Sequence, residues 1–159
     1  ELPKKLTVKQ NLIVFGKLYK IKNLNDRIDY LTSKLRLSDI LNRITGELSS
    51  GQKNRASLAK SLINDPKVLL LDEPTASLDP EIGDFIRSFL EDYKKEKKIS
   101  ILLASHNMNE VNRLCKSILM MKDGIIVDSG SPASLIEKHG RKNLEEVFLK
   151  LSRRPNEHN

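Results

Sequence analysis

Residues 68–74 read VLLLDEP, and this stretch decides the fold class. Four aliphatic side chains in a row are typical of a parallel strand that is buried on both faces of a sheet. Asp72 and Glu73 follow the run directly, at the strand end where open α/β sheets bind ligands. A carboxylate there suits Mg²⁺, and its neighbour can position or deprotonate a water molecule. A simple turn cap is the alternative for such a pair.

The flanking segments indicate alternating helices and short strands, hence an α/β fold with a mostly parallel sheet. Apolar strands are expected over residues 67–71 and 99–104, joined by a helix that Asp79 caps and Pro80 opens. Residues 6–48 carry helical periodicity only. There we expect a helix capped by Thr7 with Gln10, a second over residues 24–35, and a short third from Ser38 to residue 41. Further helices are expected over residues 52–63, 108–114, 131–140 and 143–151, and a hairpin over residues 117–121 and 125–128.

Two polar groups accompany the carboxylates. Ser49-Ser50-Gly51-Gln52 opens a helix, where exposed N–H groups and the helix dipole favour an anion such as phosphate. Ordinary capping by a serine is the alternative. His106 follows the second apolar strand and can donate a hydrogen bond to a phosphate oxygen. Most lone histidines are structural or exposed, and that interpretation is given to His139 and His158.

The 159 residues carry a formal charge of +7, which raises the question of an acidic partner. The basic side chains are mixed with acidic ones, and aromatic residues make up only 4%, so solvated surface is favoured over a nucleic-acid site. We expect no nucleic-acid partner. No apolar run is long enough to span a bilayer. The single cysteine, Cys115, lies on an apolar helical stripe, which favours burial over catalysis.

Four motifs occur in order: LSSGQ at residues 48–52, VLLLDEP, SLD at residues 77–79, and His106. Together they resemble the signature, Walker B, D-loop and switch histidine of the ABC ATPase family. The resemblance implies a partial P-loop NTPase fold: a helical subdomain over residues 1–48 ending in the signature, an α/β core over residues 49–130, and C-terminal helices with a basic tail over residues 131–159.

The same resemblance implies a role for each motif residue. Asp72 would hold Mg²⁺ through water, Glu73 would be the general base, and His106 would contact the γ-phosphate of ATP. Asp79 would link the two sites of a dimer. Ser49, Ser50, Gly51 and Gln52 would close over ATP bound to a second ATPase domain; Ser50 stands where glycine is the commonest residue of the family.

No segment matches the phosphate-binding loop G-x-x-x-x-G-K-[ST]. In the nearest candidate, residues 46–53, the lysine is displaced by one position and no Ser or Thr follows it. We therefore expect a fragment of a longer ATPase or a truncated reading frame, inactive by itself. The Walker B strand would then have an unpaired edge that favours aggregation.

The resemblance implies an ATP-hydrolysing subunit that couples hydrolysis to substrate export through a separate integral membrane permease. Ser50 and the ending LEEVFL, residues 144–149, favour the exporter-like branch. Such a subunit lies in the cytoplasm, peripheral on the inner face of the cell membrane. Two alternatives stay open: a soluble ABC-type ATPase that acts on ribosomes or DNA, and a non-catalytic truncated module.

Overall fold

A computed structural model describes residues 2–76 and 78–153. The chain divides into two compact units, residues 1–102 and 103–159, and the boundary lies within the strand β2 (Ser100–Ala104). Ser77 of the D-loop motif and His158 lie outside the described residues, as does the end of the predicted basic tail.

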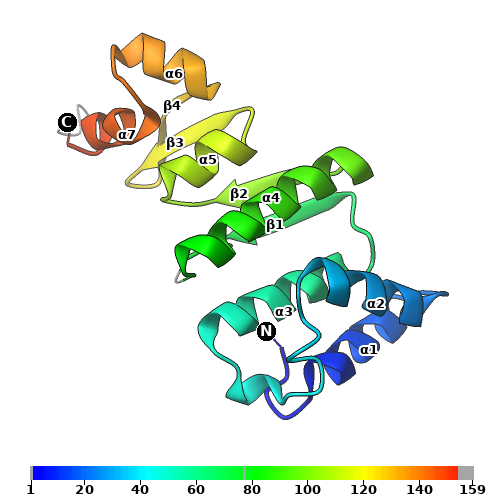
Figure 1. The fold of residues 1–159 in the computed structure, drawn as a ribbon. Coiled ribbons are helices and arrows are strands. Elements are labelled where there is room, and N and C mark those ends of the chain that lie inside the picture. Colours follow the sequence, from blue (N-terminus) through cyan, green and yellow to red (C-terminus); the bar gives the residue numbers. More distant parts are fainter. Residues whose placement is uncertain (1, 77, 154–159) are drawn as a thin grey trace. The chain divides into compact units, whose positions relative to one another are not determined.

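Unit 1 begins with three helices, α1 (Val8–Leu18), α2 (Leu24–Lys34) and α3 (Ser50–Leu62), which pack against one another (Figure 1). The predicted cap of α1 is confirmed. Thr7 accepts a hydrogen bond from the backbone of Gln10, whose side chain accepts one from Thr7. The helices bury one face each, and the fully buried aliphatic side chains on and beside α1 and α2 include Leu12, Leu31, Leu35 and Leu37.

The predicted short helix from Ser38 to residue 41 is wrong, because turns occupy that segment. The chain reverses at Arg36, whose φ is 51°, and the amide of Leu37 donates to the carbonyl of Thr32 at 2.9 Å. Ile40 is fully buried, so packing outweighs the weak capping signal of Ser38. A 3₁₀ turn, η1 (Thr45–Glu47), precedes α3 instead.

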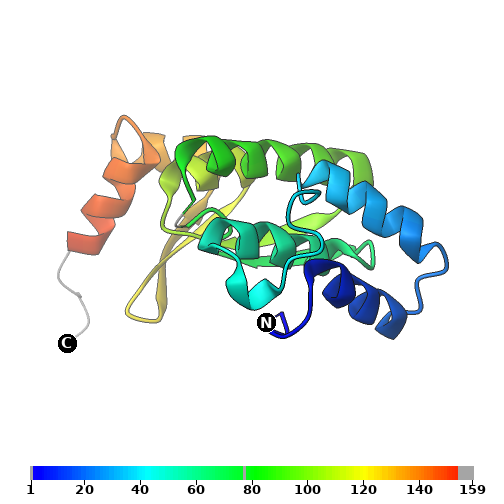
Figure 2. The same ribbon diagram turned by 60° about the horizontal axis from the view of Figure 1, so that its bottom comes forward.

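The strand β1 (Val68–Asp72) pairs with β2, and α4 (Pro80–Lys97) connects the two as a crossover helix (Figure 2). The small sheet is parallel, as expected. The cap of α4 is also confirmed: the Asp79 carboxylate accepts from the amide of Ile82 at 3.0 Å, with Pro80 at the first helical position. An apolar stripe of α4 contributes Ile86, Phe89, Leu90 and Tyr93 to the core.

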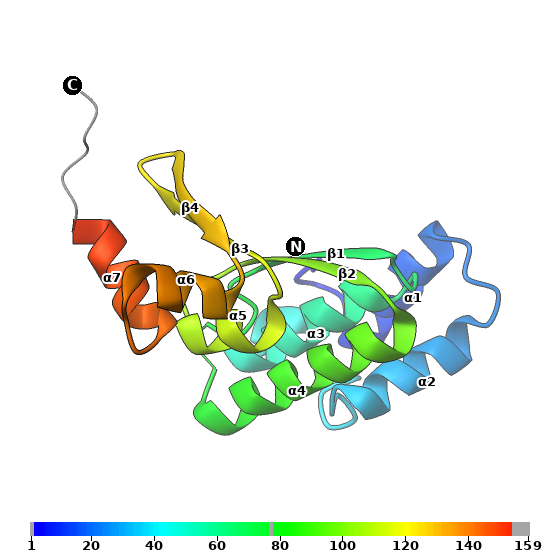
Figure 3. The same ribbon diagram turned by 90° about the horizontal axis from the view of Figure 1, so that it is seen from above.

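Burial of β1 on both faces is contradicted by the structure. Leu69 is 3% exposed, but Val68 and Leu70 on the opposite face are 59% and 70% exposed. The helices of unit 1 lie on one side of the β1–β2 sheet (Figure 3), so only alternate side chains of the strand find a partner layer. Leu102 of β2 is likewise 66% exposed.

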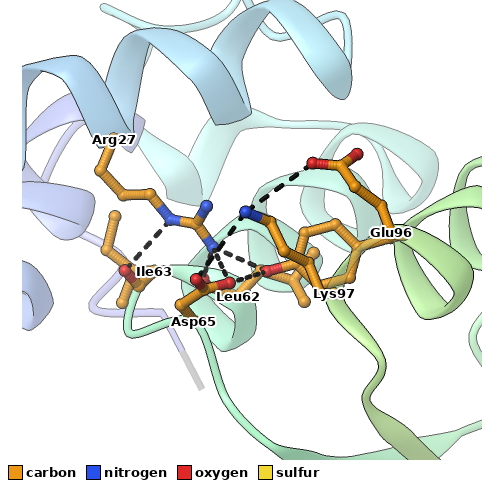
Figure 4. Close-up of polar contacts among 7 residues, drawn as sticks. Arg27, Leu62, Ile63, Asp65, Glu96 and Lys97 are labelled. Atoms are coloured by element: carbon orange, nitrogen blue, oxygen red, sulfur yellow. Dashed lines mark hydrogen bonds and ion pairs between the residues drawn. The ribbon is translucent and has the colours of Figure 1, made fainter.

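Arg27 on α2 ties three segments of unit 1 together (Figure 4). Its guanidinium donates to the carbonyls of Leu62 and Ile63 at the end of α3, and to the hydroxyl of Tyr93 on α4 at 2.8 Å. The Tyr93 hydroxyl in turn donates to Asp65 at 2.7 Å. Burial of the hydroxyl and, as the second cause, its hydrogen bond to the Asp65 carboxylate raise the pKa of Tyr93 to about 12.

Unit 2 places three helices, α5 (Met108–Leu114), α6 (Pro132–His139) and α7 (Leu144–Arg153), on one side of a hairpin of β3 (Ile118–Lys122) and β4 (Ile125–Gly130) (Figure 3). The predicted hairpin turn is confirmed. Asp123 and Gly124 both have positive φ, 50° and 79°, which suits a tight turn between twisted strands. The apolar core of this unit comprises Val111, Ile118, Met120, Leu135, Leu144, Val147 and Leu151, with Cys115 partly buried against it.

Candidate functional site

Asp72 and Glu73 stand where the sequence predicts them, at the carboxyl end of β1 in unit 1. Asp72 is the last residue of the strand and is exposed, whereas Glu73 is half-buried. The backbone turns sharply here: Glu73 has a φ of 46°, and its carbonyl accepts a hydrogen bond from the amide of Ala76 at 3.1 Å.

Among the described non-glycine residues with a positive φ, Glu73 lies in a different structural setting from the others. The others lie at helix ends or in the hairpin turn, where left-handed backbone is common, namely Lys20, Arg36, Asp65, Lys98 and Asp123. Glu73 instead directly follows a strand. A left-handed glutamate costs of order 1 kcal/mol, and such strain is typically found at functional sites.

Ser49, Ser50, Gly51 and Gln52 form the first turn of α3, also in unit 1. Ser49 and Gln52 make a reciprocal capping box, with Gln52 N donating to Ser49 Oγ at 3.3 Å and Ser49 N donating to Gln52 Oε1 at 3.1 Å. The capping alternative is thus present, and it fixes the turn that carries the small residues. A Cβ on Gly51 would lie 3.3 Å from Cδ2 of Leu78, so this turn lies beside the residue that precedes Asp79.

His106 belongs to unit 2, in the loop between β2 and α5, and is exposed. Both of its neighbours are anchored. Ser105 Oγ donates to Oε2 of Glu110 at 2.7 Å, and the amide of Asn107 donates to Ser105 Oγ at 3.1 Å. Sequence reasoning missed Glu110. The sequence does contain one signal for it: Glu110 follows Asn107, the N-cap of α5, by three residues, which is the spacing of a capping box.

Magnesium is the metal that the carboxylates suggest, and the structure allows a test of fit. Among residues 2–76 and 78–153, no cluster of three or more His, Cys, Asp or Glu side chains forms a metal cage. An exposed single carboxylate, as at Asp72, instead fits the way Mg²⁺ binds in phosphate-transfer sites, through one or two carboxylates, retained waters and phosphate oxygens. The exposed carboxylate of Asp72 therefore fits a water-mediated contact with Mg²⁺.

Comparisons with known proteins agree on one family. The family model described as ABC transporter matches residues 1–76. The chain is 35% identical to the ABC transporter ATP-binding protein NatA of Bacillus subtilis, over 91% of this chain and 59% of that protein. It is 37% identical to the Nod factor export ATP-binding protein I of a Rhizobium species, over 92% of this chain and 49% of that protein.

Solved structures give the same fold. The ATP-binding subunit of an ABC transporter superposes with a TM-score of 0.81 at 24% identity, covering 95% of this chain and 64% of that one. A dimeric ATP-binding cassette bound to ADP and Pi superposes with a TM-score of 0.74 at 24% identity, over 82% and 59%. CbiO1 of Clostridium perfringens, part of the ABC transporter complex CbiONQ, gives a TM-score of 0.72 at 31% identity, over 95% and 60%.

The chain spans about 59% of the length of NatA and 49% of the length of the Nod factor export protein. Within residues 2–76 and 78–153, no helix combines the length and the apolar character needed to cross a membrane. The fold is that of part of an ABC ATPase domain. The chain belongs to the ABC transporter family of ATP-binding proteins.

Proposed function

We propose that this chain is the signature-bearing and Walker B-bearing part of the ATPase subunit of an ABC transporter, which hydrolyses ATP to move a substrate through a separate membrane permease. The observation that carries the proposal is the strained Glu73 directly after Asp72 at the carboxyl end of β1. A carboxylate held in this way is suited to orient and deprotonate the water that attacks the γ-phosphate. The family of the chain supports the same chemistry.

Each remaining motif residue receives one role. Asp72 would hold Mg²⁺ through water, and the ion would supply positive charge beside the phosphates. His106 donates a hydrogen bond to the γ-phosphate, a role that its exposure permits. Asp79, which caps α4, lies in the segment that links the two sites of a dimer.

The first turn of α3 is proposed to act on a second ATPase domain. The capping box holds Ser49 and Gln52 in a fixed turn, while Ser50 and Gly51 leave little side-chain bulk over the first amides of the helix. Such amides, with the helix dipole, attract phosphate. The solved cassette bound to ADP and Pi is dimeric. We propose a head-to-tail dimer in which this turn covers ATP held by the partner.

Export is the proposed direction of transport. Three features support export: Ser50, the LEEVFL ending at residues 144–149, and the likeness to the Nod factor export protein. Against it stands a methionine import protein of Streptomyces griseus, which is 39% identical over 70% of this chain. The permease and a location on the inner face of the cell membrane follow from the same proposal, supported by CbiO1 as part of a transporter complex.

The test pairs the chain with the P-loop segment of an ATPase domain, so that ATP is held beside Asp72 and Glu73 of this chain, and measures phosphate release with Mg²⁺ and ATP. We expect hydrolysis by the pair and its loss with Glu73→Gln, which keeps the side-chain shape but removes the base. The matched control is Glu81→Gln, an exposed acid in the first turn of α4. An unchanged rate for Glu73→Gln would rule out the base. Copurification with ribosomes rather than an integral membrane protein would replace the transporter by a soluble ATPase.

A further inference from the structure

We propose that Glu110 is a positioning residue for His106: its buried carboxylate, acting through the hydroxyl of Ser105, fixes the loop that carries the histidine. The inference rests on the proposed role of His106 in ATP hydrolysis. Glu110 is an ionisable side chain in the first turn of α5, yet it is 0% exposed. Burying a carboxyl group costs folding free energy unless the group is hydrogen-bonded. The hydrogen bonds of Glu110 therefore indicate which part of the chain it holds in place.

The hydrogen bonds around His106 have a defined direction. A backbone amide can only donate, so the amide of Asn107 donates to Ser105 Oγ at 3.1 Å. The single hydroxyl proton of Ser105 then points to Oε2 of Glu110, at 2.7 Å. The residues on both sides of His106 are thereby connected to one carboxylate, and the backbone of the histidine is held between two anchored neighbours.

Capping of α5 does not account for this arrangement. Oδ1 of Asn107 already accepts hydrogen bonds from the amides of Asn109 at 3.1 Å and Glu110 at 3.2 Å, which satisfies the start of the helix. In a capping box, the glutamate would accept directly from the N-cap amide. Here the Ser105 hydroxyl stands between them, so the carboxylate reaches past the helix cap to the residue that precedes His106.

The chemical consequence is preorganisation. A histidine on an exposed loop has several rotamers and a mobile backbone, and only some of these place its ring on a phosphate. Misplacement by about 1 Å can reduce the rate of a phosphoryl-transfer step about 100-fold. Glu110 contacts neither ATP nor the attacking water in this proposal; it restricts the loop so that the His106 ring is in place when ATP arrives.

The test uses two pairs of variants and one matched control. Glu110→Ala and Ser105→Ala break the chain of hydrogen bonds, whereas Glu110→Gln and Ser105→Thr retain an acceptor and a hydroxyl. Val111→Ala is the control, because Val111 is the next residue of α5 and is buried at 7% exposure, but has no part in the hydrogen bonds. It reports the effect of loosening unit 2 alone.

The first readout is the NMR signal of the His106 ring in the 159-residue chain. We expect the signal to shift and broaden in Glu110→Ala and Ser105→Ala, and to return toward the parent in Glu110→Gln and Ser105→Thr. Val111→Ala should leave it in place. An unmoved signal in Glu110→Ala, or an equal change in Val111→Ala, would overturn the proposal.

The second readout is hydrolysis by the chain paired with the P-loop segment of an ATPase domain. The two alanine variants should lower kcat by roughly 10- to 100-fold and change KM less, since His106 is proposed to make only one of the hydrogen bonds to ATP. If His106→Ala retains the parent rate, the proposed role of His106 fails, while the NMR readout still decides whether Glu110 positions it. A kcat loss that Glu110→Gln and Ser105→Thr do not rescue would contradict the positioning role.

Discussion

Nε2 of His139 lies 2.6 Å from Oδ2 of Asp128, and the two side chains are only 7% and 6% exposed. This pair joins α6 to β4, and Nζ of the adjacent Lys138 donates to Oδ1 of the same carboxylate at 2.7 Å. The buried Asp128 carboxylate therefore accepts from side chains of α6 on both of its oxygens.

The free energy of unfolding of unit 2 should fall at acidic pH, because Asp128 becomes protonated there. The bond from Lys138, helped by His139 and the Ser129 amide, lowers the pKa of Asp128 from 3.8 to about 2 despite burial. Because the folded pKa is depressed, the stabilisation is full above the unfolded pKa and is lost as pH falls from about 4 to about 2. We expect Asp128→Asn to cost about 2 kcal/mol near neutral pH and almost nothing near pH 2. Urea unfolding at several pH values measures this, with the exposed Glu145→Gln as control; a loss in Asp128→Asn that is equal at both pH values would contradict it.

Ionisation of Tyr93 should destabilise unit 1 at alkaline pH. Its pKa is raised to about 12, so the stabilisation is complete below the unfolded pKa near 10 and is lost as pH rises toward 12. Tyr93→Phe removes the bonds to Asp65 and Arg27 and should destabilise the chain by about 1–2 kcal/mol at neutral pH. Tyrosinate absorbance during alkaline titration checks the pKa. Tyr19→Phe, at an exposed position, is the control, and titration of all tyrosines at their ordinary pKa would refute the prediction.

Two substitutions at Glu73 should separate the effect of backbone strain on stability from the effect of the carboxylate on hydrolysis. Glu73→Gly and Glu73→Ala both remove the carboxylate, and we expect neither to support hydrolysis in the paired assay. Glycine accepts a φ of 46° freely, whereas alanine does not, so the glycine variant should be more stable by about 1 kcal/mol. Denaturant midpoints measure the difference. Equal stability of the two variants would show that residue 73 is unstrained.

Gly51 should tolerate a methyl group structurally but not functionally. An added Cβ would lie 3.3 Å from the end of the flexible Leu78 side chain, and alanine favours a helix, so Gly51→Ala should change stability by less than about 1 kcal/mol. The same methyl should block close approach of a partner's phosphate and lower hydrolysis by the pair. Lys53→Ala, exposed on α3, is the control. Full activity of Gly51→Ala would exclude close contact at this turn.

Local chemistry made several elements predictable from the sequence. Thr7, Asp79 and Ser131 cap helices as their side chains and spacing require, and Asp123-Gly124 turns the hairpin. These features depend on residues within four positions of one another. The Walker B and signature segments are recognisable for the same reason, since each motif is a continuous stretch placed at the end of a strand or the start of a helix.

Other features depend on residues far apart in the chain, and no local pattern reveals them. Arg27 meets Asp65 and Tyr93 across 38 and 66 positions, and Asp128 meets His139 across two elements. The exposure of Leu70 was unpredictable because an apolar run does not show how many layers will cover it. The roles of Asp72, Glu73, His106 and the signature residues stay predictions, since the structure gives their placement and not their contacts with ATP.

The guanidinium of Arg27 also has a mechanical consequence. It clamps α2 to the end of α3 and to α4, and Asp65, which shares that clamp, lies three residues before β1. We expect a displacement of α2 to be transmitted through Arg27 and Asp65 toward the strand that ends in Asp72. Replacing Arg27 with a shorter residue would remove this link, so that α2 could move independently of α3 and α4.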